Sequence, residues 1–246
     1  MSFKLSVKRR VNKTLRALLR KKEVEIHGII VPLELIHYEQ AMKELDRGTY
    51  EDAEAALIAR YFKPGGTVVE LGASLGIISA VIGKTAPARL VCVEALPDLA
   101  AAVERMLARN CPDVPHKVIE CAIGPADGQM AFTADETDNM TGKAADSSGG
   151  KRTFQVPARR LSTILAEEKI EGPFHLVCDI EGMEAALFLD DAGALARCAG
   201  VILEAHPTEY KGRMFSPDDI FQLCGSLGFE LVERRRNAAY FKRKGG

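Results

Sequence analysis

The sequence predicts an α/β fold in which helices cover both faces of a doubly wound, mostly parallel sheet. Short apolar runs alternate with helical patterns from residue 67 onward, most of these runs are apolar throughout, and two strand-like runs end the chain. Strands that are apolar throughout are typical of parallel sheets buried on both faces. With 246 residues, of which 47% are hydrophobic, the chain can form one sizeable core.

The first 49 residues are expected to form an appendage to this fold. Residues 23–36 are rich in β-branched side chains around a glycine and a proline, which favours two short strands. We therefore predict a basic helical and β appendage over residues 1–49 and the α/β domain over residues 50–246. Residues 4–22 have the spacing of an amphipathic helix, with an apolar stripe of Val7, Val11, Leu15 and Leu18.

Five strand–helix units and a terminal hairpin are expected in the α/β domain. A helix over residues 50–62 precedes them, and the polar, Gly/Ser-rich stretch 125–152 is expected to be a long loop. The expected strands are residues 67–71, 89–95, 116–124, 174–180 and 200–206, with a strand-like run at 153–158 and hairpin runs at 229–235 and 238–244. The expected helices are residues 74–84, 97–110, 161–169, a segment from about Met183, and 216–228, which Ser216 caps.

The near-neutral charge conceals two basic ends and an acidic middle. The chain has 33 basic and 34 acidic residues, yet residues 1–22 contain nine Lys/Arg and no acid, and residues 233–246 contain six Lys/Arg and one acid. The N-terminal helix could dock on the protein by its apolar stripe, or it could contact a membrane or another anionic surface.

Localisation is expected to be cytoplasmic. No apolar run reaches the roughly 18 residues of a membrane-spanning helix, and no apolar segment follows the N-terminal bases as in a secretory signal. The six cysteines are scattered singly, without metal-ligand spacing, as in a reducing compartment.

Ligands of open α/β sheets bind beyond the carboxyl ends of the strands, so functional residues are expected where strands end. The first strand runs into an E-x-G-x-x-x-G loop, which differs from the dinucleotide pattern G-x-G-x-x-G. A carboxylate beside such a loop suits a cationic ligand such as S-adenosylmethionine, although a tight turn could need the glycines for packing alone. The candidate cofactor-binding residues of this loop are Glu70, Gly72, Ala73, Ser74 and Gly76.

The next two strand ends favour a nucleoside ligand. Glu94, followed by Ala95, ends the second strand, where an acid can accept hydrogen bonds from both hydroxyls of a ribose. Ala122 and Ile123 end the third strand with small and apolar groups that suit an adenine. Since NAD and S-adenosylmethionine both contain a ribose, these residues are compatible with either ligand.

Acidic residues and a histidine follow the fourth and fifth strands. Asp179, Glu181 and Glu184 surround one loop, and His206 ends the fifth strand. The carboxylates could orient an acceptor hydroxyl, act as general base or hold a divalent cation, and Glu181 and Glu184 could instead cap a helix. His206 could take a hydroxyl proton. We assign Asp179, Glu181 and His206 as candidate catalytic residues, Asp179 also as a cofactor contact, and no metal ion.

Five segments resemble the FkbM-type family of S-adenosylmethionine-dependent methyltransferases, which belong to the class I, Rossmann-like group. The similarity covers roughly residues 50–210, and D-I-E-G-M-E (179–184) is its most specific element. The five segments are VVELGASLGIISAVIGK (68–84), VCVEALPDLAAAVERMLARN (91–110), VIECAIG (118–124), FHLVCDIEGMEAALF (174–188) and VILEAHP (201–207).

The resemblance implies a seven-stranded sheet with an antiparallel last strand, S-adenosylmethionine as methyl donor, and a hydroxyl acceptor. By position, Glu70, Gly72 and Gly76 match the first donor-binding motif and Glu94 matches the ribose-binding acid. Asp179, Glu181 and Glu184 match the D-x-E-G-x-E segment. The common family version has Asp and Asn where this chain has Glu70 and Ser74.

We therefore expect an O-methyltransferase that acts on a hydroxyl of a sugar, glycan or natural product, with no nucleic-acid partner. Two alternatives remain at this stage: an NAD(P)-dependent oxidoreductase of Rossmann type, and a non-catalytic nucleoside-binding module. The sequence is also compatible with a homo-oligomer.

Overall fold

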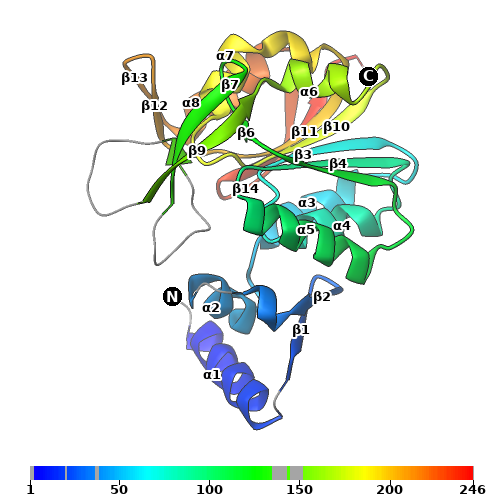
Figure 1. Cartoon of the computed structure of the whole chain (residues 1–246), viewed down its shortest axis with the longest axis vertical. Coiled ribbons are helices and arrows are strands. Elements are labelled where there is room, and N and C mark those ends of the chain that lie inside the picture. Colours follow the sequence, from blue (N-terminus) through cyan, green and yellow to red (C-terminus); the bar gives the residue numbers. More distant parts are fainter. Residues whose placement is uncertain (1–2, 20, 37–38, 135–142, 145–151, 246) are drawn as a thin grey trace.

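The computed structural model describes residues 3–19, 21–36, 39–134, 143–144 and 152–245 (Figure 1). Its centre is a seven-stranded sheet, which confirms the predicted fold. The strand order is β14-β15-β11-β10-β3-β4-β5, and β15 runs antiparallel to both of its neighbours. The strands are β3 (Thr67–Leu71), β4 (Arg89–Glu94), β5 (His116–Glu120), β10 (Phe174–Cys178), β11 (Cys198–Glu204), β14 (Phe229–Arg235) and β15 (Ala238–Arg243).

Helices cover both faces of this sheet, and each face has its own core. Figure 1 shows α3, α4 and α5 on one face and α6, α7 and α8 on the other. Side chains alternate along each strand, so Val68 joins the first core while Val69 and Leu71 join the second. The helices are α3 (Asp52–Tyr61), α4 (Ile77–Lys84), α5 (Pro97–Asn110), α6 (Leu161–Glu167), α7 (Glu184–Asp190) and α8 (Pro217–Ser226), with a short 3-10 helix at Ala192–Arg197. The expected Ser216–Asp219 capping box is present on α8.

A second, four-stranded sheet corrects two expectations. The strand expected over residues 116–124 is interrupted at Cys121, because only β5 belongs to the central sheet while β6 (Ala122–Ile123) pairs in parallel with β9 (Arg152–Arg159). The loop expected over residues 125–152 is wrong in part, since it contains β7 (Gly128–Ala134), which pairs antiparallel with β9, and β8 (Lys143–Ala144). Residues 135–142 and 145–151 lie outside the described part of the chain.

A helical segment before α3 and a hairpin after β11 were also not predicted. Helix α2 (Glu39–Arg47) follows a short 3-10 helix (Leu33–Leu35), and β12 (Thr208–Tyr210) pairs with β13 (Arg213–Phe215). The turn between these strands has positive φ at Lys211 and Gly212, the conformation that two-residue hairpin loops need.

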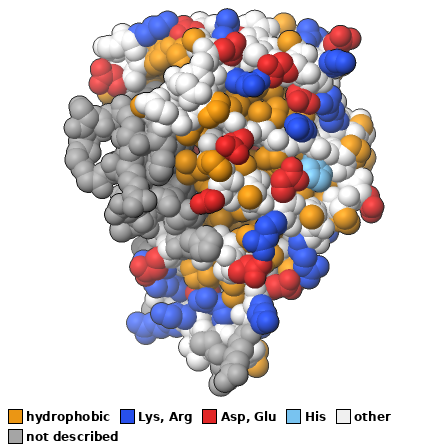
Figure 2. Space-filling view, in the orientation of Figure 1, with side chains coloured by type: hydrophobic (Ala, Val, Ile, Leu, Met, Phe, Trp, Pro, Cys, Tyr) orange, Lys and Arg blue, Asp and Glu red, His pale blue; other side chains and the backbone are white. Residues whose placement is uncertain are grey.

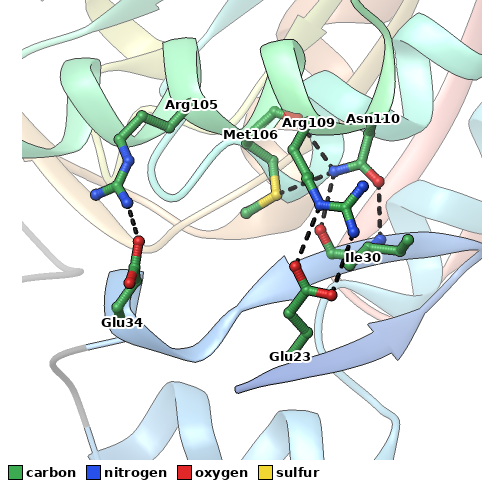
Figure 3. A network of polar contacts seen from close by, with 7 residues as sticks. All are labelled: Glu23, Ile30, Glu34, Arg105, Met106, Arg109 and Asn110. Atoms are coloured by element: carbon green, nitrogen blue, oxygen red, sulfur yellow. Dashed lines mark hydrogen bonds and ion pairs between the residues drawn. The ribbon is translucent and has the colours of Figure 1, made fainter. Parts of the chain in front are cut away.

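The N-terminal elements share a core with the α/β domain. Strands β1 (Glu23–Ile26) and β2 (Ile29–Pro32) form a hairpin, and its buried residues join one cluster with α3, α4 and α5. Asn110 at the end of α5 holds β2 by accepting from the Ile30 N–H at 2.8 Å and donating to the Ile30 carbonyl at 2.9 Å (Figure 3). The division at residue 49 therefore remains a prediction.

Helix α1 (Phe3–Leu18) packs on α2 through polar side chains. Arg16 forms an ion pair with Asp46 at 2.9 Å, and Asn12 donates to the Asp46 carbonyl at 2.8 Å. Val11 and Leu15 are 49% and 44% exposed. Docking by the apolar stripe is therefore wrong for these two residues; the side chains of Val7 and Leu18 lie outside the described part. Among the described residues, no helix is both long and apolar enough to cross a membrane.

Asn110→Ala is expected to lower the free energy of unfolding by about 1–3 kcal/mol, because both polar groups of Ile30 lose their partner. Urea unfolding followed by circular dichroism measures this. Arg109→Ala serves as the control on the same helix, because its pair with Glu23 is 45% and 44% exposed (Figure 3) and should contribute less than about 1 kcal/mol. Equal losses in the two variants would contradict a special role for Asn110.

Candidate active site

The loop between β3 and α4 lies at the carboxyl end of the sheet and depends on two glycines. Gly72 has a φ of +82°, and a Cβ built on it would lie 1.6 Å from the Asp179 carbonyl oxygen. Gly76 has a φ of +77°, and its Cβ would lie 2.7 Å from the Val103 Cα. The first glycine lets the loop touch the end of β10, and the second lets α4 approach α5.

Glu94 fastens this loop to the end of β4. Its carboxylate, which is 6% exposed, accepts from the Ser74 N–H at 2.8 Å and from the Leu96 N–H at 2.9 Å. Burial raises the pKa of Glu94 above its ordinary value. The structure thus brings Ser74 and Glu94 together, with Ala73 beside them through its N–H bond to the Val93 carbonyl.

A small apolar cluster lies beside Glu94 in the sequence and contains two of the predicted cofactor-binding residues. Ala95 and Ala122 are buried in one small cluster with Val156. Ile123 points elsewhere, since it belongs to the core between the sheet and α6–α8. The structure therefore places Ala95 and Ala122 together and separates Ile123 from them.

Glu70 lies beneath the loop, inside the domain. Its carboxyl group is 2% exposed and accepts a hydrogen bond from the Ser79 hydroxyl of α4 at 2.5 Å. Burial raises the pKa of Glu70 to about 7. The position supports the loop from below.

His206 lies among the acids that follow β10 and β11. Its Nδ1 atom is 3.0 Å from Oε1 of Glu184, which is fully buried. A carboxylate can only accept, so Nδ1 carries a proton, and in the neutral imidazole Nε2 is then the acceptor. Nε2 is 3.8 Å from carboxylate oxygens of both Glu181 and Glu204, and Nδ1 is 3.7 Å from Oδ1 of Asp179. The three predicted catalytic residues therefore lie together, with Glu184 orienting the imidazole.

The surrounding charge sets the protonation of this cluster. Burial acts to lower the pKa of His206, but the Glu184 hydrogen bond and the charges of Glu181, Glu184 and Glu204 outweigh it and raise that pKa above 6.5. Burial, followed by the charges of Glu204 and Glu181, raises the pKa of Asp179 well above its ordinary value.

The beginning of α3 adds two acids that no sequence pattern indicated: Glu54 is buried and Glu51 is half-buried. Burial and a hydrogen bond with Glu204 raise the pKa of Glu54 to about 9, and burial with the charges of Glu54 and Glu204 raises the pKa of Glu51. Acids in the first turn of a helix are ordinarily explained by the macrodipole, so the sequence carried no signal that these two face the cluster.

The cluster suits a cationic ligand. Oδ1 of Asp179 and Oε2 of Glu184 are buried and have no hydrogen-bond partner among the described residues. Unpaired acceptors of this kind favour a ligand that brings positive charge or donors. Asp179, Glu181 and His206 also offer one ligand atom each within 4.8 Å of one another, so they could hold a metal ion.

The stability of the ligand-free protein is expected to fall as pH rises from about 5 to about 9. Glu70 and Glu54 have folded-state pKa values of about 7 and about 9, so they stay protonated in the folded protein at pH values where the unfolded chain has already ionised. The stability that the protonated, buried carboxyls provide at low pH is lost as pH rises through these folded-state values. Urea unfolding across this range measures it. Glu54→Gln should flatten the slope above pH 7, while the exposed-site control Glu209→Gln should not; an unchanged slope in Glu54→Gln would contradict the buried, protonated carboxyl.

The strand order, the glycine loop after β3 and the buried acid after β4 define a class I methyltransferase fold. The family model described as the methyltransferase FkbM domain matches residues 70–231, which is more than half of the chain. The chain therefore belongs to the FkbM methyltransferase family, and its methyl donor is S-adenosylmethionine. Both results confirm the expectations from sequence and set aside the oxidoreductase and non-catalytic alternatives.

A solved structure of an FkbM methyltransferase supports the fold. The chain is similar to the FkbM methyltransferase of Methylobacillus flagellatus KT with a TM-score of 0.52 and 14% identity, over 85% of this chain and 56% of that one. It thus spans little more than half the length of that relative. It is also similar to the magnesium protoporphyrin IX methyltransferase of Synechocystis PCC 6803, with a TM-score of 0.49 and 12% identity over 99% and 98% of the two chains. No curated protein sequence matches this chain.

Proposed function

We propose that the protein transfers a methyl group to a hydroxyl of a small-molecule or glycan acceptor, and that His206 takes the hydroxyl proton. The observation that carries this proposal is the Glu184–His206 pair, in which a fully buried carboxylate fixes Nδ1 at 3.0 Å and leaves Nε2 as the acceptor. A base oriented by a third group is the usual arrangement for activating an oxygen nucleophile.

The chain has little other chemistry to perform. S-adenosylmethionine supplies an activated methyl group when bound, so the protein mainly aligns the reacting groups and removes one proton. Gly72, Ser74 and Glu94 would hold the donor. Asp179 and Glu181 flank the imidazole and would orient the acceptor hydroxyl.

Glu94 and Glu70 are expected to differ in their effect on the donor. Glu94→Gln should weaken the affinity for S-adenosylhomocysteine about tenfold or more, because two N–H groups hold that carboxylate at the loop. Glu70→Gln should leave the affinity nearly unchanged, because its carboxyl is buried below the loop. Isothermal titration calorimetry measures both. Equal losses would contradict the assignment of Glu94 as the acid that contacts the donor.

The acceptor class is tested by methyl transfer to a panel of hydroxylated sugars, glycans and phenols, with matched amines as controls. Mass spectrometry detects the gain of a methyl group. We expect transfer to hydroxyl acceptors, a rate that rises with pH as His206 loses its proton, and no change after removal of metal ions by EDTA. Transfer confined to amines would overturn the acceptor class, and loss of activity with EDTA would overturn the metal-free role of His206.

A further inference from the structure

Helix α1 is attached to the protein by the side that amphipathic helices normally expose. Among the side chains that the structure describes, its polar contacts to α2 include the Arg16–Asp46 ion pair at 2.9 Å and the Asn12 bond to the Asp46 carbonyl at 2.8 Å. Asp46 is 5% exposed, so these polar groups form the buried side of the contact. Three apolar side chains that the structure describes near the other side of the helix are exposed.

The exposed stripe consists of Val11 and Leu15 from the predicted stripe together with Leu19, which follows α1. Their spacing of four residues puts them on one face, and the helical bonding continues to Leu19, whose N–H donates to the Leu15 carbonyl at 2.9 Å. They are 49%, 44% and 60% exposed. A row of large exposed apolar residues on one helix is typical of an interaction surface.

The helix that carries the stripe is strongly basic. Residues 1–22 contain nine Lys/Arg and no acid, and Lys8, Arg10 and Lys13 are exposed on α1 itself. Lys and Arg side chains gather over the lower part of the molecule in Figure 2, where Figure 1 places α1 and α2.

We propose that α1 binds the surface of an anionic lipid bilayer, with Val11, Leu15 and Leu19 inserted among the lipids and the positive charge of residues 1–22 attracted to the headgroups. An aliphatic stripe within a basic helix is the combination that interfacial membrane helices use. A nucleic acid would use the bases but leave the stripe in water. A second copy of the helix would bring two strongly basic segments together, which like-charge repulsion opposes.

Co-sedimentation with vesicles tests the surface. The full chain is mixed with vesicles of phosphatidylcholine alone or of phosphatidylcholine with phosphatidylglycerol, at about 0.1 M and about 1 M salt, where the Debye length is about 10 Å and 3 Å. We expect binding to the anionic vesicles that weakens at high salt. Equal binding to neutral vesicles, or none to anionic ones, would overturn the proposal.

Two triple variants separate the stripe from general exposed apolar surface. Val11→Ser, Leu15→Ser and Leu19→Ser together should weaken vesicle binding about tenfold or more. The matched control changes Leu189, Leu231 and Val232 to Ser, since these residues are 45%, 48% and 46% exposed elsewhere on the protein, and should bind as the wild type does. S-adenosylhomocysteine affinity reports folding in both. Unchanged binding by the stripe variant would refute the assignment.

A fluorescence experiment locates the contact directly, because the sequence contains no tryptophan. Leu15→Trp creates a single reporter on the stripe, and Leu189→Trp creates one at a similarly exposed site away from it. Anionic vesicles should shift the emission of the first to shorter wavelength and leave that of the second unchanged. A shift of Leu15→Trp emission with an oligonucleotide or with rising protein concentration, but not with vesicles, would assign the stripe to nucleic acid or self-association instead.

Discussion

Replacing His206 with asparagine is expected to lower kcat by about 10²–10⁴-fold, the usual contribution of a general base, with little change in affinity for S-adenosylhomocysteine. The asparagine amide can still donate to Glu184, so the fully buried carboxylate keeps a partner. The asparagine amide cannot, however, take up a proton as Nε2 of His206 does. Steady-state kinetics with a hydroxyl acceptor, combined with calorimetry of donor binding, measure the two quantities.

The control for this variant is another histidine–glutamate pair. Nε2 of His116 lies 3.0 Å from a carboxylate oxygen of Glu104. His116 is at the beginning of β5, whereas the candidate site lies where the strands end. His116→Asn should therefore keep the wild-type kcat. The rise of rate with pH should also disappear in His206→Asn. If kcat and the pH profile are unchanged, another group takes the proton.

Gly72→Ala is expected to abolish measurable donor binding and to destabilise the fold. The new Cβ would lie 1.6 Å from the Asp179 carbonyl oxygen, and backbone cannot move away as a flexible side chain can. The end of β10 and the loop after β3 would have to separate, which displaces Ser74 and Asp179 together. Thermal unfolding and calorimetry with S-adenosylhomocysteine measure the two effects.

Gly65→Ala is the matched control, because Gly65 has a similar φ of +85° with nothing within 4 Å of its Cβ. It should cost only the roughly 1–2 kcal/mol of a left-handed residue and leave donor affinity unchanged. The difference between the two variants therefore isolates the close approach of the loop to β10. Wild-type donor affinity in Gly72→Ala would show that this approach is not needed.

Much of the fold could be predicted because its signals are local. Apolar runs and the Gly and Pro residues between them predict the strands of the central sheet close to their observed positions. The Ser216–Asp219 capping box likewise marks the beginning of α8. Asp179 and His206 could be grouped because carboxyl ends of parallel strands meet at one edge. The position of Glu70 was also within reach: it alternates with Val69 and Leu71, so it had to face the other side, beneath α4.

What the sequence could not predict depends on contacts between distant segments. Glu54 becomes part of the acidic cluster only because the beginning of α3 packs beside Glu204 at the end of β11. The pairing of β7 with β9 crosses a polar stretch whose composition favours a loop. Amphipathic spacing placed Val11 and Leu15 on one side of α1. Spacing alone does not tell which side of α1 packs against α2.

The attachment of α1 has a consequence for how this protein can change over time. Among the described residues, the core cluster begins at Ile26, and α1 contributes no side chain to it. The contacts of α1 that the structure describes are polar and peripheral, whereas β1, β2 and α2 contribute side chains to the hydrophobic interior. Selection can alter, strengthen or discard α1 without disturbing the catalytic machinery, so where the enzyme works and what it catalyses can evolve separately.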